Sequence, residues 1–217
     1  MPNYAHHTFE GGGIAIWHIT ETSDVLYALL GTQRYDAQLL EKKNESRRAE
    51  WLAVRLLVKE LFGAECEVAY HPTGRPYLKN GIAHISISHT KGFAAVAYHH
   101  EAPIGMDIEY ISSRVERIAS RFTTQVETSY IDMHDEDVRQ MFHLINWSAK
   151  ETLYKLFDSP SMAEFKEVFH IAPYMLAECG TMNATVCSAE KILLAVSYRT
   201  FPEFVCTWAV ASAMLKD

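Results

Sequence analysis

The stretch Ile104-Gly105-Met106-Asp107-Ile108-Glu109-Tyr110 decides how the rest of the chain is interpreted. Its apolar side chains alternate with Gly105, Asp107 and Glu109, which predicts a β-strand that buries one face. Asp107 and Glu109 then project side by side from the other face, and Gly105 leaves room for a group to approach the backbone. Two close carboxylates are unfavourable unless a cation lies between them. A hard divalent ion such as Mg2+ meets that need, and a solvated sheet face is the alternative.

Composition limits the classes of protein to which the chain can belong. The 217 residues are 48% hydrophobic and 22% charged, as in an ordinary globular protein of one large or two small domains. A net charge of -7 argues against nucleic-acid binding, so a polyanionic ligand would need a local basic cluster. No apolar run approaches the ~18 residues of a membrane span. The start of the chain lacks the plan of a signal peptide, and the four cysteines form no C-x-x-C pair, so we expect reduced thiols and a cytoplasmic protein.

Hydrophobic periodicity predicts two halves of similar make-up. Each half reads as a long helix and several strands, and a junction between Tyr98 and Ile104 gives lobes 1–102 and 103–217. Helices are expected over 24–30, 46–62, 112–122 and 135–157, and strands over 14–19, 67–71, 83–89, 93–98, 104–110, 192–198 and 204–210. The glycines 11–13 read as a flexible entry to the first strand, because no Gly-Lys-Ser/Thr follows them. The pattern predicts an α+β fold with an antiparallel-rich sheet packed on a long helix in each lobe.

Candidate phosphate contacts in the first half lie at the ends of predicted elements. Arg75 stands in the turn Gly74-Arg75-Pro76, which proline and glycine make rigid. Ser88 and His89 end the strand 83–89 and could donate hydrogen bonds to phosphate oxygens. The alternative for His89 is a hydrogen bond to the turn backbone. A Ser/His nucleophile pair is disfavoured because adjacent strand residues point apart and no G-x-S-x-G motif is present.

Charged residues in the second half fall at helical spacings. Glu151 and Lys155 are one turn apart, so they form either an exposed ion pair or a third carboxylate and a phosphate-binding cation. The three arginines of the 112–122 segment are spaced i, i+3, i+7, which places them along one helix face. That stripe is either solvated or a docking surface for an acidic partner, and it consists of Arg114, Arg117 and Arg121.

Four motifs occur in a fixed order along the chain: Gly74-Arg75-Pro76, then Ile87-Ser88-His89-Thr90, then the strand 104–109, then Trp147-Ser148-Ala149-Lys150-Glu151-x3-Lys155. Together they resemble the 4'-phosphopantetheinyl transferases, specifically the larger type with two similar halves in one chain. The resemblance runs from about Arg47 to Lys155. It implies two α/β lobes related by a pseudo-twofold axis, with the active site where the lobes join.

The resemblance also implies a reaction and a set of site residues. The phosphopantetheine arm of coenzyme A would pass to a serine of an acyl or peptidyl carrier protein, with release of 3',5'-ADP. The Mg2+ ligands would be Asp107, Glu109 and Glu151. Coenzyme A contacts would come from Arg75, Ser88, His89 and Lys155, with Lys150 near them and Arg48 the choice from the first long helix. The family often has Asn two residues before Ser-His, where this chain has Ser86.

Charge balance agrees with these assignments. Coenzyme A carries about four negative charges near neutral pH, which three carboxylates alone would repel. Bound Mg2+ removes that repulsion, and Arg75, His89 and Lys155 balance the remainder. We expect Glu151, or a metal-bound water beside Glu109, to accept the serine proton, and Lys155 to assist the leaving group.

Two other classes of protein remain open at this stage. One is a non-catalytic module that binds coenzyme A or a carrier protein, which would not need all three carboxylates. The other is a Mg2+-dependent phosphate hydrolase, which would use water as the acceptor. For the transferase, the arginine stripe would dock the carrier protein. We expect a monomer, because two halves in one chain can supply the whole cleft.

Overall fold

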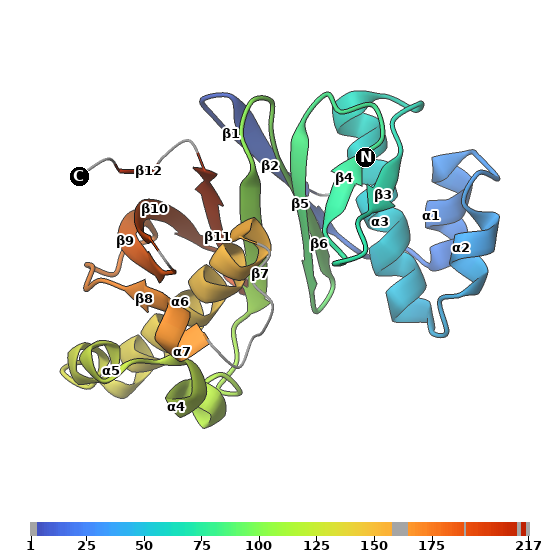
Figure 1. Ribbon diagram of the computed structural model, residues 1–217. Helices are drawn as coiled ribbons and strands as arrows, with labels where there is room; N and C mark the ends of the chain where they lie inside the picture. The colour runs from blue at the N-terminus through green and yellow to red at the C-terminus, as the bar shows by residue number, and fades with distance from the viewer. Residues whose placement is uncertain (1–3, 158–164, 189, 212–213, 216–217) are drawn as a thin grey trace. The chain divides into compact units, whose positions relative to one another are not determined.

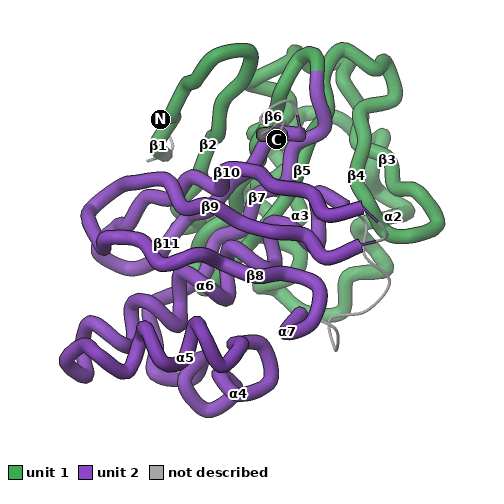
Figure 2. The backbone as a smooth tube through the Cα atoms, turned by 60° about the vertical axis from the view of Figure 1, so that its left-hand side comes forward, with its two compact units in different colours: residues 1–101 green, residues 102–217 purple. Residues whose placement is uncertain are grey.

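The structure is a computed structural model that describes residues 4–157, 165–188, 190–211 and 214–215. The chain is a mixed α/β protein with antiparallel sheets, and it divides into two compact units, residues 1–101 and 102–217 (Figure 2). The boundary between the units therefore falls one residue before the boundary between the predicted lobes. That the two lobes form a pseudo-twofold pair stays a prediction.

The first unit is built on a four-stranded antiparallel sheet with the order β1-β2-β6-β5 (Figure 1). Its strands are β1 (Tyr4–Phe9), β2 (Gly12–His18), β5 (His84–Thr90) and β6 (Phe93–His99). The sequence did not predict β1. Gly11 has φ of 72° in the turn between β1 and β2, so the glycines join two strands and do not merely precede the first one.

Three helices and a short hairpin complete the first unit. They are α1 (Ser23–Leu30), α2 (Asp36–Leu40), α3 (Glu45–Phe62), β3 (Val68–Tyr70) and β4 (Pro76–Leu78). The α3 helix starts where the Asn44 side chain accepts a hydrogen bond from the backbone N–H of Arg47. Its apolar face packs on β2 and β6 and buries Leu52 and Leu57 completely. The helix predicted over 46–62 is confirmed.

The second unit contains an antiparallel sheet with the order β7-β11-β10-β9-β8. Its strands are β7 (Ile104–Tyr110), β8 (Phe169–Ile171), β9 (Cys179–Cys187), β10 (Lys191–Thr200), β11 (Phe204–Val210) and β12 (Met214–Leu215), which pairs with β10. The strand over 104–110 and the β10–β11 hairpin are confirmed. The sequence did not predict β9, whose nine residues pair along β10.

The longest helix, α6 (Glu136–Phe157), packs on β7 and β11, and the core of the second unit lies between them. Shorter helices follow one another nearby: η1 (Glu116–Ile118), α4 (Ala119–Phe122), α5 (Gln125–Ile131) and α7 (Phe165–Val168). The single helix predicted over 112–122 is wrong. Ile118, the last residue of η1 and the N-cap of α4, has φ of -114° and ψ of 2°, outside the helical range, so the two helices are not continuous. None of the described helices has the length and apolar character to cross a membrane.

Candidate active site

The candidate site starts at β7, where α6 approaches unusually closely. A Cβ atom placed on Gly105 would lie 2.2 Å from the backbone oxygen of Thr152. The group that approaches this glycine is therefore the α6 backbone. The contact fixes the separation between β7 and α6. Residues of α6 within about one turn of Thr152 therefore face the carboxylates of β7.

Asp107 is buried at the centre of this contact. Its Oδ2 accepts a hydrogen bond from the Ser148 hydroxyl at 2.9 Å, and its Oδ1 lies 2.7 Å from the Lys155 ammonium. The Ser148 hydroxyl is also 2.9 Å from that of Thr207, directly across the sheet from Asp107. A buried carboxylate with two partners, one of them a cation, is held in place firmly.

Glu109 and Glu151 complete a group of three acidic side chains. Trp147 donates its indole N–H to Glu109 Oε1 at 2.8 Å. Burial and the nearby Asp107 charge raise the pKa of Glu109 to about 7, against the lowering effect of the Trp147 hydrogen bond. Burial and Asp107 likewise raise the pKa of Glu151 to about 7, while Lys155 lowers it. The negative charge of Asp107 therefore acts on both glutamates, Glu109 on β7 and Glu151 on α6.

The three carboxylates have the chemistry of a divalent-cation site, although no group of three His, Cys, Asp or Glu side chains in the described residues is arranged to hold a metal ion as it stands. Lys155 and Ser148 hold the Asp107 carboxylate instead. Burial and the repulsion from Asp107 raise the pKa of both glutamates, and a hard cation would relieve that repulsion. The chemistry of the three carboxylates suits a hard cation, and Mg2+ binding by Asp107, Glu109 and Glu151 stays a prediction.

A cavity of about 280 Å³ opens beside Glu109. Apolar side chains of Val115, Ile118, Leu144 and Trp147 line much of it, and Arg114 lies at its wall. The cavity brings a space with mostly uncharged walls next to the acidic group.

The candidate residues of the first unit lie at the end of β5, in the turn between β3 and β4 and near the start of α3. His89 lies at the end of β5, with Nε2 at 3.2 Å from Arg47 Nη1 and Nδ1 at 3.6 Å from Glu50 Oε2. Ser88 is buried one residue earlier on the same strand. Arg75 lies in the turn between β3 and β4, which the bond from Gly74 N–H to the His71 carbonyl closes at 2.8 Å. These positions agree with the rigid turn expected there.

Arg47 contacts His89, and the role of Arg48 as a coenzyme A contact stays a prediction. The Nε of Arg48 donates instead to the Lys42 carbonyl at 3.1 Å. Adjacent residues on a helix point about 100° apart, so Arg47 and Arg48 project from different faces of α3. The sequence carried no signal that fixed the phase of α3 against β5.

Lys150 does not lie where the prediction placed it. Its side chain is fully buried, and its ammonium donates to the Phe122 carbonyl at 2.6 Å and to Glu127 Oε2 at 2.9 Å. Glu127 also accepts from the backbone N–H of Thr124 and of Ile171, at 2.6 Å and 2.7 Å. The predicted coenzyme A contact of Lys150 is therefore corrected: this lysine joins α6 to α4, α5 and β8.

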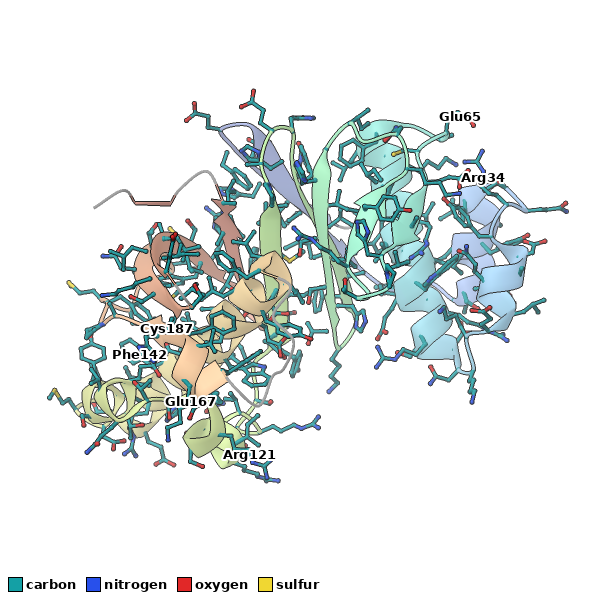
Figure 3. All side chains as sticks on the ribbon, in the orientation of Figure 1. Arg34, Glu65, Arg121, Phe142, Glu167 and Cys187 are labelled. Atoms are coloured by element: carbon teal, nitrogen blue, oxygen red, sulfur yellow. The ribbon has the colours of Figure 1, made fainter. Side chains whose placement is uncertain are left out.

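The three arginines of the predicted docking stripe are all exposed, but they do not share one helix. Arg114 precedes η1, Arg117 is in η1 and Arg121 is in α4, where Figure 3 labels it. Their common face is therefore not a regular helical stripe. Their exposure still leaves all three available to an acidic partner.

Sequence reasoning missed the side chains that hold the carboxylates. Trp147 and Ser148 were noted only as part of a motif, yet they bind Glu109 and Asp107. The spacing of Trp147 from Lys155 was a usable signal, because residues 147, 151 and 155 recur every fourth position on one face. Glu127 was also missed, although Thr124-x-x-Glu127 is a recognisable capping box.

Comparison with known proteins places part of the chain in a family. Residues 103–199, which contain β7 and α6, match the family model for the 4'-phosphopantetheinyl transferase superfamily. A search of curated proteins found no match.

Proposed function

We propose that this chain, whose residues 103–199 belong to the 4'-phosphopantetheinyl transferase superfamily, transfers the phosphopantetheine arm of coenzyme A to a serine of an acyl or peptidyl carrier protein. We assign it to the larger type with two lobes. The observation that carries the proposal is the electrostatic coupling of Asp107, Glu109 and Glu151 beside Lys155, inside the segment that matches the family. When bound, Mg2+ would neutralise this acidic group and the diphosphate of coenzyme A.

The residues of the chain have distinct roles in this proposal. The serine hydroxyl of the carrier attacks the β-phosphorus of coenzyme A, the bond from that phosphorus to the bridging oxygen breaks, and 3',5'-ADP leaves. Glu151, with a pKa of about 7, accepts the serine proton. Lys155, which already compensates the Asp107 carboxylate, balances the charge on the leaving phosphate. Glu109 holds its place through Trp147.

Residues of the first unit supply the cationic contacts to coenzyme A. Arg75, Ser88 and His89 keep the roles assigned to them, and Arg47 joins His89. Arg48, the choice from α3 made on the sequence, donates its Nε to the Lys42 carbonyl and is kept as a second candidate.

The cavity beside Glu109 supports the proposal because its walls suit an uncharged arm. Pantetheine is a long chain of amides and methylene groups without charge, and the cavity offers Val115, Ile118 and Leu144. Arg114 at its wall, together with Arg117 and Arg121, would meet an acidic carrier protein. Monomeric state and cytoplasmic location stay predictions.

Mass spectrometry of an apo carrier protein incubated with coenzyme A and Mg2+ tests the proposal. Gain of one phosphopantetheine group on the carrier supports transfer. An unchanged carrier with hydrolysed coenzyme A supports a phosphate hydrolase, and no reaction with binding of coenzyme A supports a binding module. A Glu151→Gln variant is the matched control, because it keeps the shape of the side chain and removes the proposed base. Transfer by that variant at the wild-type rate under saturating Mg2+ would show that Glu151 is not the base.

A further inference from the structure

A second cavity lies entirely in the first unit, between α2, α3 and the β3–β4 hairpin. Its volume is about 640 Å³, and it contains none of the residues assigned to coenzyme A or Mg2+. Three aromatic rings form part of its wall, those of Tyr35, Trp51 and Tyr70. Tyr35 and Trp51 meet edge to face with ring centroids 5.5 Å apart, and Tyr70 is 48% exposed. The cavity therefore offers aromatic surface to a ligand from solvent.

A buried arginine lies behind these rings. The Arg55 guanidinium is 3.6 Å from the Trp51 ring centroid, 5.7 Å from that of Tyr70 and 5.9 Å from that of Tyr35. It donates to the Trp51 carbonyl at 3.4 Å and to the Tyr70 hydroxyl at 3.3 Å, and its Nε has no hydrogen-bond partner in the described structure. Only 3% of Arg55 is exposed.

The Arg55 charge has no carboxylate partner among the described residues. Each ion pair there that involves an arginine belongs to Arg34 or Arg47. Burial lowers the pKa of the Arg55 guanidinium, which reflects the cost of keeping this charge away from water. An unpaired buried charge is expensive, and aromatic faces compensate only part of that cost. A negative charge brought close to the rings would lower it.

The other cations at the cavity differ in how far they are already paired. Arg34 lies 3.0 Å from Glu65, with both side chains labelled in Figure 3, and Lys79 is paired with Glu67. Lys42 lies 6.0 Å from the centroid of the Trp51 ring and forms no ion pair in the described part of the chain. Glu41 also lines the cavity but is exposed, so solvent screens its charge. Lys42 and Arg55 thus approach one indole ring, and both lack a carboxylate.

We propose that this cavity binds a nucleoside monophosphate, an anion that carries a planar aromatic base. The ring of the ligand would lie against Tyr70 and Trp51. Its phosphate would bind Lys42, and its negative charge would partly compensate the positive charge of Arg55. A neutral ring would gain only the stacking, and a bare phosphate would gain only the charge contact. The proposal does not depend on the transferase activity, because it uses a separate set of residues.

Isothermal titration of the full chain with adenosine 5'-monophosphate tests the proposal, with adenosine and inorganic phosphate as partial ligands. We expect saturable binding of the nucleotide at least tenfold tighter than binding of either partial ligand. Lys42→Ala should weaken nucleotide binding about tenfold or more, since a charge-assisted hydrogen bond contributes about 1.5–3 kcal/mol. Lys43→Ala is the matched control, because it removes the same charge from the next residue, which does not line the cavity. Tyr70→Ala should also weaken binding.

Other results would overturn the proposal. These are absence of saturable binding, equal effects of Lys42→Ala and Lys43→Ala, or adenosine binding as tightly as the nucleotide. Loss of nucleotide binding in His89→Ala, with Lys42→Ala unchanged, would move the nucleotide to the coenzyme A contacts and also overturn it. Retained binding in His89→Ala supports the cavity. A chain that fails to modify any carrier protein but still binds the nucleotide would separate failure of the proposed function from failure of this inference.

Discussion

Lys155 Nζ lies 2.7 Å from Asp107 Oδ1 and 3.2 Å from the Met106 carbonyl, so one cation joins the last turns of α6 to the middle of β7. The same ammonium lowers the pKa of both glutamates of the site, opposing the effect of burial. Lys155 therefore compensates part of the negative charge of the acidic group, in addition to any contact it makes with a substrate.

Replacement of Lys155 by Met should raise the pKa of Glu109 and Glu151 further above 7, because the compensating charge is lost while burial remains. The acidic limb of the pH–rate profile for carrier modification should then move to higher pH. The rate at neutral pH should fall about 100-fold or more, since acid–base function typically contributes about 10²–10⁴ in rate. Lys155→Arg, which keeps the charge, should leave the limb near its original pH. An unshifted limb in Lys155→Met would contradict this role.

Stability should fall as pH rises through neutrality in the absence of divalent cations. The folded protein holds protons on Glu109 and Glu151 up to about pH 7, whereas the unfolded chain releases them near the ordinary value of 4.5. Between these values the native state binds more protons, so the free energy of unfolding decreases as pH increases. The loss is at most about 3.5 kcal/mol for each group, since each pH unit corresponds to about 1.4 kcal/mol.

Thermal unfolding from pH 5 to pH 8 measures this effect. Glu151→Gln should flatten the curve, because its amide does not titrate. Mg2+ should raise Tm more at pH 8 than at pH 5.5, since a metal binds the deprotonated carboxylates. A Tm that rises steadily over this range without Mg2+ would contradict the prediction.

Gly105→Ala should destabilise the second unit strongly. The new methyl group would overlap the Thr152 carbonyl, and relief requires α6 to move away from β7. Overpacking of this kind costs about 1–3 kcal/mol or more. Gly81→Ala is a suitable control, because Gly81 has φ of 67° but nothing within 4 Å of the added atom. Urea denaturation should show the larger loss for Gly105→Ala, and equal losses would show that α6 accommodates the methyl group easily.

Lys150→Met should destabilise the protein by about 3–5 kcal/mol, because removal of one partner leaves a buried charge uncompensated. Glu127, 2.9 Å from Lys150, would keep its hydrogen bonds from Thr124 and Ile171 but lose the compensating charge of Lys150. The double variant Lys150→Met/Glu127→Gln should recover part of the loss. Denaturant unfolding of the single and double variants measures the coupling. A folded Lys150→Met protein of wild-type stability with a raised KM for coenzyme A would instead restore the original prediction for this lysine.

Charge reversal of Arg114, Arg117 and Arg121 to Glu should raise the carrier KM and leave coenzyme A affinity unchanged. All three side chains are exposed, so their substitution should cost little stability. Steady-state kinetics with varied carrier concentration measures the first effect, and calorimetric titration with coenzyme A measures the second. If both constants stay at their wild-type values, these arginines form only a solvated surface.

The sequence indicated the parts of the site that follow from simple periodicity. Alternation along 104–110 placed Asp107 and Glu109 on one face of a strand, and helical spacing placed Glu151 one turn before Lys155. These signals depend only on local geometry, so they survive without knowledge of the neighbours. The strand β1 lacked such a signal, because its polar and histidine-rich sequence is stabilised by pairing with β2.

Side-chain partners could not be predicted where they depend on the phase of one element against another. Lys150 and Glu151 are neighbours in sequence, yet Lys150 is fully buried against Glu127 while Glu151 joins the carboxylates. Arg47 and Arg48 differ in the same way. In each case about 100° of helix rotation separates the two side chains, and only tertiary packing selects which one faces the site.

The contacts between α6 and β7 limit the insertions and deletions that the gene can tolerate. Trp147, Ser148 and Lys155 reach Glu109 and Asp107 from fixed steps along one helix. Insertion or deletion of a single codon between positions 147 and 155 would turn everything beyond it by about 100°, and no compensating amino-acid exchange could return every contact at once. Insertions and deletions among descendants of this chain should therefore avoid that interval, even where individual residues within it are substituted.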